Sequence, residues 1–271
     1  MDYKTYKPGK ELSTLIKCYW TLEADAEEKP QKQRIVPDGC VEMIFNHGDL
    51  YRQYLDESNS IVQPRCFVIG QLTEPLYIEP TGKTGIFSAR FYPGGFMPFA
   101  TMPIKQMENK AVSLQQLFSG DGITLEQNIL HAETSADKIT IVENFLTSRL
   151  TNIETIDRIL KSTVETIVSV NGQISVGELS QQMNINRRQL ERKFSSTTGL
   201  SPRQLAKIVR LQAAFKMLLN NQFTSLTSLA YEGDYYDQAH FIKDFKEFTG
   251  LTPKKFYSDN LQMSSLFYGS E

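Results

Sequence analysis

The spacing of apolar side chains divides the chain into two parts. From residue 1 to about 110, short apolar runs are interrupted by Gly, Pro, Asn and Asp, the pattern of strands separated by turns. Strands are predicted over residues 15–22, 41–45, 51–55, 66–69, 76–78 and 84–92. From about residue 113, apolar residues recur every three or four positions, as on amphipathic helices. The pattern predicts a two-domain α+β chain, in which an antiparallel β-barrel or sandwich with some helices precedes an all-α domain.

The helical segments begin before the predicted domain boundary. They are predicted over residues 114–118, 125–130, 136–150 and 153–170. With the boundary at Thr151-Asn152, the chain divides into residues 1–150, residues 151–260 and a tail, 261–271, to which no role is assigned. The 136–150 helix leaves two interpretations open, since its apolar face can pack on the β-domain of the same chain or on a second chain.

An internal repeat organises the helical part. Residues 190–202 and 241–253 share the ending Phe-x4-Gly-Leu-x-Pro at a constant offset (245 − 194 = 51 and 250 − 199 = 51). Upstream, Leu179 matches Leu229 at an offset of 50, so the second copy holds one extra residue between its helices. Core packing alone does not require such duplication, which indicates a repeated functional unit.

The first copy has the pattern of a short helix, a tight turn and a second helix. Ser175 and Glu178 are spaced as a capping box. Asn184 suits a left-handed turn position, Asn186 suits the cap of the second helix, and Gly199 suits its end. A short helix, a turn and a polar second helix form the helix-turn-helix pattern, whose second helix enters the DNA major groove.

The second copy repeats this pattern with aromatic residues. Asp234 is predicted at the turn, and Asp237 or Tyr236 at the start of the second helix. The side chains predicted to be buried on this helix are Phe241, Phe245 and Phe248.

Charge is distributed unequally between the two copies. Residues 187–216 contain eight basic residues and one acid (8 − 1 = +7), whereas residues 224–247 contain two basic residues and five acids (2 − 5 = −3). Neutralisation of phosphates supplies most non-specific affinity for DNA. The first unit is therefore predicted to supply most of the binding energy, and the second to add less or mainly to adjust specificity.

Three motifs together resemble a known family. The segments 210–212 (Arg-Leu-Gln) and 237–241 (Asp-Gln-Ala-His-Phe), with the paired Phe-x4-Gly-x2-Pro endings, resemble the DNA-binding domain of AraC/XylS-type transcription regulators. The likeness covers roughly residues 155–257. It implies two helix-turn-helix units joined by a long helix over about 202–219. That helix would be about 27 Å long and would place the recognition helices in successive major grooves, roughly 34 Å apart.

The resemblance also assigns positions that contact DNA. Its base-reading positions correspond to Arg188, Glu191 and Arg192, and to Ala239, His240 and Lys243. The full set of residues predicted to contact DNA is Arg187, Arg188, Glu191, Arg192, Lys193, Gln238, Ala239, His240 and Lys243. Arginine pairs with guanine and glutamate accepts from cytosine, whereas alanine offers only a methyl contact. The second turn departs from the family pattern, because Gly233 stands one place early.

The resemblance further implies a cupin-like β-domain that senses a ligand or forms dimers. Residues 37–40 (Pro-Asp-Gly-Cys) and 91–95 (Phe-Tyr-Pro-Gly-Gly) resemble one sensor subfamily. An apolar barrel mouth with a few polar groups is a common ligand site. The candidate ligand-binding residues are Trp20, Asp38, Glu42, Arg90 and Tyr92. A structural Glu42–Arg90 pair inside the barrel is the alternative interpretation, since a buried carboxylate needs a partner.

Other functional classes find little support in the sequence. The three histidines form no His-x-His or two-His-one-carboxylate cluster, and there is no phosphate-binding Gly loop or nucleophile elbow. We therefore expect no enzymatic activity, no metal and no cofactor. Cys18, Cys40 and Cys66 are expected to be structural thiols of a cytoplasmic protein, since no signal peptide or membrane-length apolar run is present.

The sequence thus predicts a DNA-binding transcription regulator controlled by a small-molecule effector in its N-terminal domain. The alternative is a DNA-binding regulator whose β-domain only mediates dimerisation or protein contacts and binds no ligand. The expected partners are double-stranded promoter DNA and the effector, with RNA polymerase and a second copy of the chain as further candidates. No membrane contact is expected.

Overall fold

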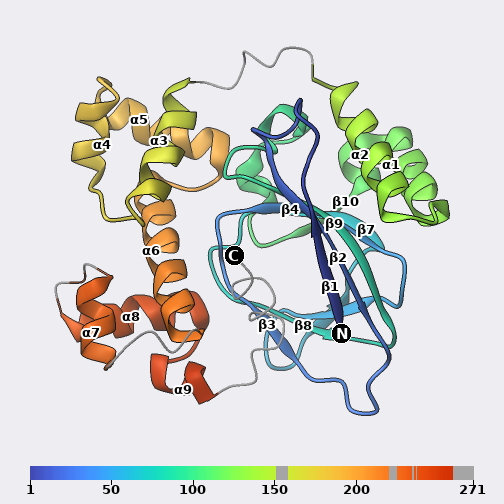
Figure 1. Cartoon of the computed structure of the whole chain (residues 1–271), viewed down its shortest axis with the longest axis horizontal. Helices are drawn as coiled ribbons and strands as arrows, with labels where there is room; N and C mark the ends of the chain where they lie inside the picture. The colour runs from blue at the N-terminus through green and yellow to red at the C-terminus, as the bar shows by residue number, and fades with distance from the viewer. Residues whose placement is uncertain (151–157, 220–224, 234, 236, 259–271) are drawn as a thin grey trace.

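The computed structural model describes residues 1–150, 158–219, 225–233, 235 and 237–258. A β-rich part is followed by a column of helices that lies beside it (Figure 1). The fold is therefore the predicted α+β arrangement of an antiparallel β-domain followed by an all-α domain. The predicted boundary at Thr151-Asn152 and the predicted tail, 261–271, lie outside the described residues.

The β-domain consists of two antiparallel sheets that face each other. The larger sheet has the strand order β1-β2-β9-β4-β7-β10, and the smaller has the order β3-β8-β5-β6. In the large sheet the strands are β1 (Asp2–Tyr6), β2 (Ile16–Ala24), β4 (Val41–Asn46), β7 (Cys66–Ile69), β9 (Thr84–Phe91) and β10 (Ala111–Ser113). In the small sheet they are β3 (Gln33–Ile35), β5 (Tyr51–Tyr54), β6 (Ser60–Val62) and β8 (Leu76–Pro80).

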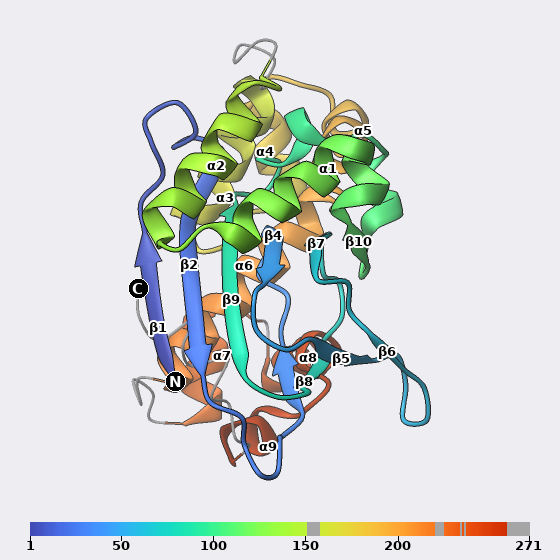
Figure 2. The same ribbon diagram turned by 90° about the vertical axis from the view of Figure 1, so that its right-hand side faces the viewer.

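The large sheet is buried on both faces because successive side chains point in opposite directions. One set, which includes Tyr19, Phe45 and Phe87, packs beneath α1 (Leu114–His131) and α2 (Ser135–Thr147). Figure 2 shows these two helices lying across β2, β9 and β4. The alternate set faces the small sheet and forms the interior of the β-domain.

Four strands were not predicted, and each has a physical reason. β1 is polar and lies at the edge of the large sheet, paired only with β2. β6 is fully exposed at the edge of the small sheet, while β3 and β10 are three residues long. Short and edge strands lack the apolar alternation that makes a strand visible in sequence.

The helices of the β-domain differ from the prediction in one respect. The two turns predicted over 114–118 and 125–130 belong to one helix, α1, which bends at Ser119, where φ is +54°. α2 spans Ser135–Thr147, close to the predicted 136–150. Val142 and Leu146 of α2 are buried against the large sheet of the same chain, so its apolar face packs on its own β-domain.

The helical domain follows the predicted repeat closely. The first helix-turn-helix unit consists of α4 (Val176–Gln182) and α5 (Arg187–Thr198), and the second consists of α7 (Leu226–Glu232) and α8 (Gln238–Thr249). α6 (Pro202–Leu219) joins the two units and has the predicted bounds. α3 (Arg158–Ser169) packs on α6, and α9 (Pro253–Ser258) follows α8. Residues 153–157 of the predicted 153–170 helix lie outside the described residues.

The turns and caps explain why the two copies fold alike. The Ser175–Glu178 capping box is formed, Asn184 adopts φ of +47° at the turn, and Asn186 caps α5. Gly199 and Gly250 end the two recognition helices, α5 and α8, in the left-handed conformation, with φ of +79° and +74°. Asp237 caps α8. The predicted turn residue Asp234 lies outside the described residues.

The helical domain and the pair α1–α2 lie on opposite sides of the β-domain (Figures 1 and 2). Gln212 of α6 donates a 2.6 Å hydrogen bond to the carbonyl oxygen of Pro37, and a methyl group added at Gly39 would lie 2.8 Å from Leu205 of the same helix. These contacts fix the linking helix to the loop that precedes β4.

Candidate nucleic-acid interface and candidate ligand sites

The recognition helix of the first unit, α5, is amphipathic. Leu190 and Phe194 are fully buried, which turns Arg187, Arg188 and Arg192 outward. Glu191 is half-buried and forms an ion pair with Arg187, with 3.2 Å between Arg187 Nε and Glu191 Oε1. A surface pair of this kind contributes little to stability, so it can be exchanged for contacts with DNA at small cost. The structure therefore brings four of the predicted DNA-contacting side chains together on one outer face.

Lys193 lies on another side of α5. Each residue of an α-helix is rotated by about 100° from the last, so Lys193 projects away from Arg192 and toward the β-domain. It is half-buried and lines a cavity between the two domains. The structure thus separates Lys193 from the other predicted DNA-contacting residues of α5.

The recognition helix of the second unit, α8, presents a smaller and less basic outer face. Ala239, His240 and Lys243 are exposed, whereas Gln238 is half-buried and accepts a hydrogen bond from Thr227. The His240 imidazole lies 3.7 Å from the Asp244 carboxylate and edge-on to the Tyr235 ring. His240 is therefore held at its base while its outer edge faces solvent.

Three acids of the second unit make contacts within the protein, and Asp244 is the buried one among them. Asp237 caps α8 by accepting a hydrogen bond from the His240 amide. Asp244 is buried and pairs at 2.9 Å with Lys207 of α6, which also pairs at 2.8 Å with Glu247. These acids fix α8 to the linking helix. The net charge of −3 counted along the sequence therefore overstates the negative charge that this unit presents to DNA.

Four of the five predicted ligand residues meet inside the β-domain. Glu42 and Arg90 are partners across β4 and β9, with 3.5 Å between Arg90 Nε and Glu42 Oε1. Arg90 also donates to Asp38, while Trp20 and Ser88 each donate to Glu42 at 3.0 Å. The Glu42–Arg90 pair predicted from the strand alternation is therefore present, extended by Asp38.

The two carboxylates of this cluster differ in their pKa. Burial raises the pKa of Glu42 above its ordinary value, and the opposing charge of Arg90 does not offset it. Burial also acts to raise the pKa of Asp38, but the charge and hydrogen bond of Arg90 outweigh burial and leave that pKa lowered. Arg90 therefore faces both carboxylates and donates its hydrogen bond to Asp38, while Glu42 is stabilised by the charge of Arg90 and by hydrogen bonds from Ser88 and Trp20.

The space left inside the β-domain is small. The cavity between the sheets has a volume of about 70 Å³ and is lined by this cluster and by apolar side chains such as Ile44 and Ile78. Sites for drug-sized ligands usually enclose about 300–1,000 Å³. Tyr92, the fifth predicted ligand residue, lies elsewhere: it is 39% exposed and follows β9 on the side that faces the helical domain.

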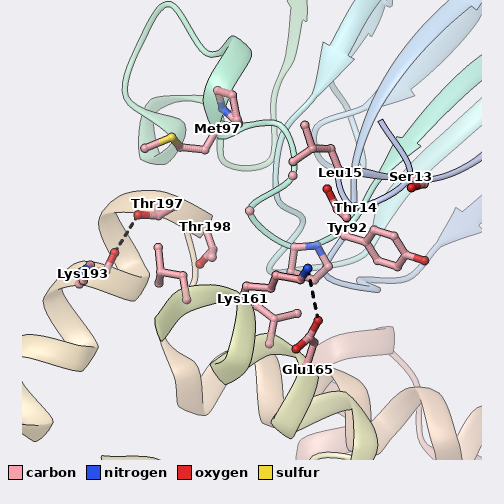
Figure 3. Close-up of a pocket in the computed structure, with 16 residues that line it drawn as sticks. Ser13, Thr14, Leu15, Tyr92, Met97, Lys161, Glu165, Lys193, Thr197 and Thr198 are labelled. Carbon is pink, nitrogen blue, oxygen red and sulfur yellow. Dashed lines mark hydrogen bonds and ion pairs between the residues drawn. The ribbon is translucent and has the colours of Figure 1, made fainter. Parts of the chain in front are cut away.

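A larger cavity, of about 490 Å³, lies between the domains (Figure 3). Its walls come from the loop before β2, the loop after β9, the middle of α3 and the C-terminal end of α5. The sequence singled out only Tyr92 and Lys193 among these residues. The others were missed because they come from four segments up to about 180 residues apart, and the Phe-Tyr-Pro-Gly-Gly motif at 91–95 was the one local signal.

Other chemistry is limited within the part of the chain that the structure describes. Its residues form no group of three or more His, Cys, Asp or Glu side chains that could hold a metal ion. The three cysteines are free thiols, and burial raises the pKa of both Cys40 and Cys66. A raised thiol pKa disfavours the reactive thiolate. No described helix combines the length and the apolar composition required to traverse a bilayer.

Two tandem helix-turn-helix units on a common linking helix, preceded by a β-domain, have the architecture of a DNA-binding transcription regulator. The comparisons with known families agree. Residues 179–258 match a family described as "Helix-turn-helix domain", and residues 4–113 match a family described as "Domain of unknown function (DUF6597)". The C-terminal domain therefore matches a helix-turn-helix family, in agreement with the helix-turn-helix pattern of the two sequence repeats.

Individual proteins extend this comparison. An uncharacterized HTH-type transcriptional regulator of Haemophilus influenzae is 32% identical over 81 residues, which is 30% of this chain. The chain spans only 27% of the length of that relative. ToxT from Vibrio cholerae is similar over 89% of this chain and 98% of its own, with 13% identity and a TM-score of 0.47. A structure of ToxT bound to an unsaturated fatty acid is similar over 88% of this chain and 93% of its own, with 11% identity and a TM-score of 0.43.

Proposed function

We propose that the protein is a sequence-specific transcription regulator that binds promoter DNA with α5 and α8 and is controlled by a small-molecule effector. The outward side chains of α5, above all Arg188 and Arg192, supply base and phosphate contacts. His240 and Lys243 of α8 supply fewer contacts and adjust specificity. Basic side chains neutralise the phosphates of DNA, and this supplies most of the non-specific affinity. Because α5 is the more basic of the two helices, it carries the larger share of the affinity.

The observation that carries this proposal is that both recognition helices end against the β-domain. A methyl group added at Gly199 would lie 2.9 Å from Ile104, and one added at Gly250 would lie 2.6 Å from the Tyr77 hydroxyl. The N-terminal halves of α5 and α8, which contact bases in this class of domain, point away from these contacts. A change in the β-domain can therefore alter how both helices are presented to DNA.

The first experiment is selection of bound sequences from a random duplex pool with the full-length protein at a fixed salt concentration. We expect a two-part motif with centres about one helical turn apart. A single short motif would mean that α8 does not read bases under these conditions. Failure to enrich any sequence would contradict the proposed function.

A second candidate function keeps the DNA-binding part and removes the effector. The small cavity between the sheets favours a β-domain that mediates only dimerisation or protein contacts. A thermal melting temperature that stays constant across a broad metabolite panel would support this candidate. A ligand that raises the melting temperature, as binding to the folded state requires, would support the effector-controlled regulator.

A further inference from the structure

We propose that the cavity between the domains, rather than the interior of the β-domain, binds the effector, and that the effector is an amphipathic small-molecule anion. This inference rests on the proposed function, because it names the site and the chemical class of the effector. In contrast to the predicted site around Glu42 and Arg90, this cavity has walls from both domains.

The size of the cavity fits a small molecule. Its volume of about 490 Å³ lies within the usual range for ligand sites, whereas the space between the sheets, about 70 Å³, holds only a few waters. In the interior, Arg90 already pairs with Asp38 and Glu42, and Glu42 also accepts hydrogen bonds from Trp20 and Ser88. An effector bound there would have to displace packed side chains.

The walls of the cavity are mainly apolar. Leu15, Met97 and Pro98 come from the β-domain, and Leu160 and Val164 come from α3. Figure 3 shows Met97 and Leu15 on one side of the cavity and the helices α3 and α5 on the other. Met97 remains 42% exposed although it lies between two domains. Filling the cavity would remove this apolar surface from water, which favours a ligand with an apolar body.

The polar groups at the cavity favour an anionic head. Lys161 of α3 and Lys193 of α5 lie in the lining, against one acid, Glu165. Lys161 and Glu165 form an exposed pair with 3.9 Å between Nζ and Oε1, a weak interaction that an anionic ligand can replace. Hydroxyl groups of Ser13 and Thr14 complete the rim on the side of the β-domain.

The cavity is connected to DNA binding through α5. Lys193, Thr197 and Thr198 line the cavity at one end of this helix, and Arg188 lies at its exposed other end. α5 is a single helix of 12 residues, so a displacement of its C-terminal end also displaces the base-reading end. A ligand that contacts both walls therefore changes the orientation of α5 relative to the β-domain.

The test uses the full-length protein and two fluorescent probes that share one aromatic skeleton. 8-Anilinonaphthalene-1-sulfonate (ANS) carries an anionic head, and N-phenyl-1-naphthylamine (NPN) is its neutral counterpart. We expect both to bind with increased fluorescence, and ANS to bind more tightly. An ANS fluorescence that does not increase with the folded protein, or a tighter binding of NPN, would overturn the proposal.

Substitutions in α3 test whether the probes bind in the cavity. Val164→Phe fills the cavity and is expected to abolish the increase in fluorescence. Val168→Phe is the matched control, because Val168 lies one turn further along α3, is 50% exposed and does not line the cavity. Thr14→Phe fills the cavity from the opposite wall and replaces Val164→Phe if the latter fails to melt cooperatively. Unchanged ANS binding in a folded cavity-filling variant would overturn the proposal.

Charge variants test the anionic head. Lys161→Gln is expected to weaken ANS binding by up to about fivefold, as expected for a partly exposed charge pair, and to leave NPN binding unchanged. Glu165→Gln is expected to strengthen ANS binding. An equal effect of either substitution on both probes would overturn the assignment of an anionic head.

The final step separates this inference from the proposed function. Saturating ANS is expected to shift the Kd for the selected duplex in the wild-type protein and not in Val164→Phe. An unchanged Kd in the wild type, despite bound ANS, would overturn the role of the cavity in regulation. ANS binding that is lost in Val164→Phe, in a protein that selects no duplex, would retain the cavity site and refute the proposed function.

Discussion

The two helix-turn-helix units share their local geometry but differ in what surrounds them. In both, an Asn or Asp caps the recognition helix, a Phe at the same repeat position is fully buried, and a left-handed Gly ends the helix. The first unit turns three arginines outward and borders the interdomain cavity. In the second, Asp244 and Glu247 pair with Lys207 of the linking helix, and the core is packed with aromatic rings.

This difference shows that the repeat preserves the framework and leaves the surface free to change. Caps, turns and buried positions are determined by backbone geometry, so both copies need similar residues at them. Exposed positions carry no such requirement. One copy can therefore become the main DNA contact while the other becomes a rigid, less basic support. Four groups of substitutions, taken from the largest expected effect to the smallest, test this comparison.

The largest effect is expected from removing the buried phenylalanine in each unit. Phe194→Ala and Phe245→Ala should each cost about 3–5 kcal/mol of unfolding free energy by leaving a cavity. The cost of Phe245→Ala should lie at the upper end of this range, because Phe245 contacts the rings of Phe215, Phe241 and Phe256. Chemical denaturation of both variants measures the difference. A wild-type midpoint for either variant would contradict its place in the core.

The next effect is specific to the second unit. Lys207→Met leaves the buried Asp244 without its 2.9 Å partner and should cost about 3 kcal/mol of unfolding free energy, the low end for a buried pair. The low end of that range is expected because Glu247, which also loses its pair with Lys207, is exposed to water and needs no other partner. Lys246→Met, an exposed charge on α8, is the control and should change stability by less than about 0.5 kcal/mol. Equal effects of the two substitutions would refute the structural use of these acids.

Substitutions at the base-contacting positions should lower the affinity for DNA more in the first unit than in the second. Arg188→Ala or Arg192→Ala should weaken specific binding by about 1–3 kcal/mol and relax one position of the selected motif. His240→Ala should have a smaller effect, because the second unit supplies fewer contacts. Binding assays with the selected duplex and a scrambled duplex provide the measurement. An equal loss on both duplexes would assign the arginines to phosphate contacts instead.

The smallest effect should be the same in both units. Asn186→Ala and Asp237→Ala each remove the side chain that caps a recognition helix and should each cost about 1 kcal/mol of unfolding free energy. Thermal melting of the two variants gives the comparison. A difference of more than about 1 kcal/mol would show that the two frameworks are not equivalent.

The sequence predicted the helical domain more completely than the β-domain. Helix ends depend on local residues such as Ser175, Asn184 and Gly199, each of which acts within a few positions of itself. The bounds of α6 were implied by the family resemblance instead, and the structure has the same bounds. Strand pairing joins residues far apart, and the edge strands β1 and β6 gain their structure only from a neighbour. Their own polar sequences carry no matching signal.

The candidate sites were predicted only in part. Strand alternation and the need for a counter-ion were sufficient to pair Glu42 with Arg90. The same argument could not place Tyr92, because its orientation depends on a loop that faces the helical domain. Likewise, Lys193 was grouped with its basic neighbours on α5, although the rotation between successive helical residues places it on another side, at the cavity between the domains. Strand alternation therefore located the Glu42–Arg90 pair, whereas the contacts between the domains left no signal in the sequence.

The linking helix α6 also sets a limit on how the protein can evolve new binding sites. One residue inserted into its 18 residues would rotate the second unit by about 100° and shift it by about 1.5 Å. The same insertion would break the hydrogen bond from α6 to Pro37 and would move Gly250, which ends α8, away from Tyr77. The phase between the two halves of an operator is therefore determined by the length of one helix. Point substitutions can change which bases each half prefers, whereas the spacing of the halves changes only with the chain length.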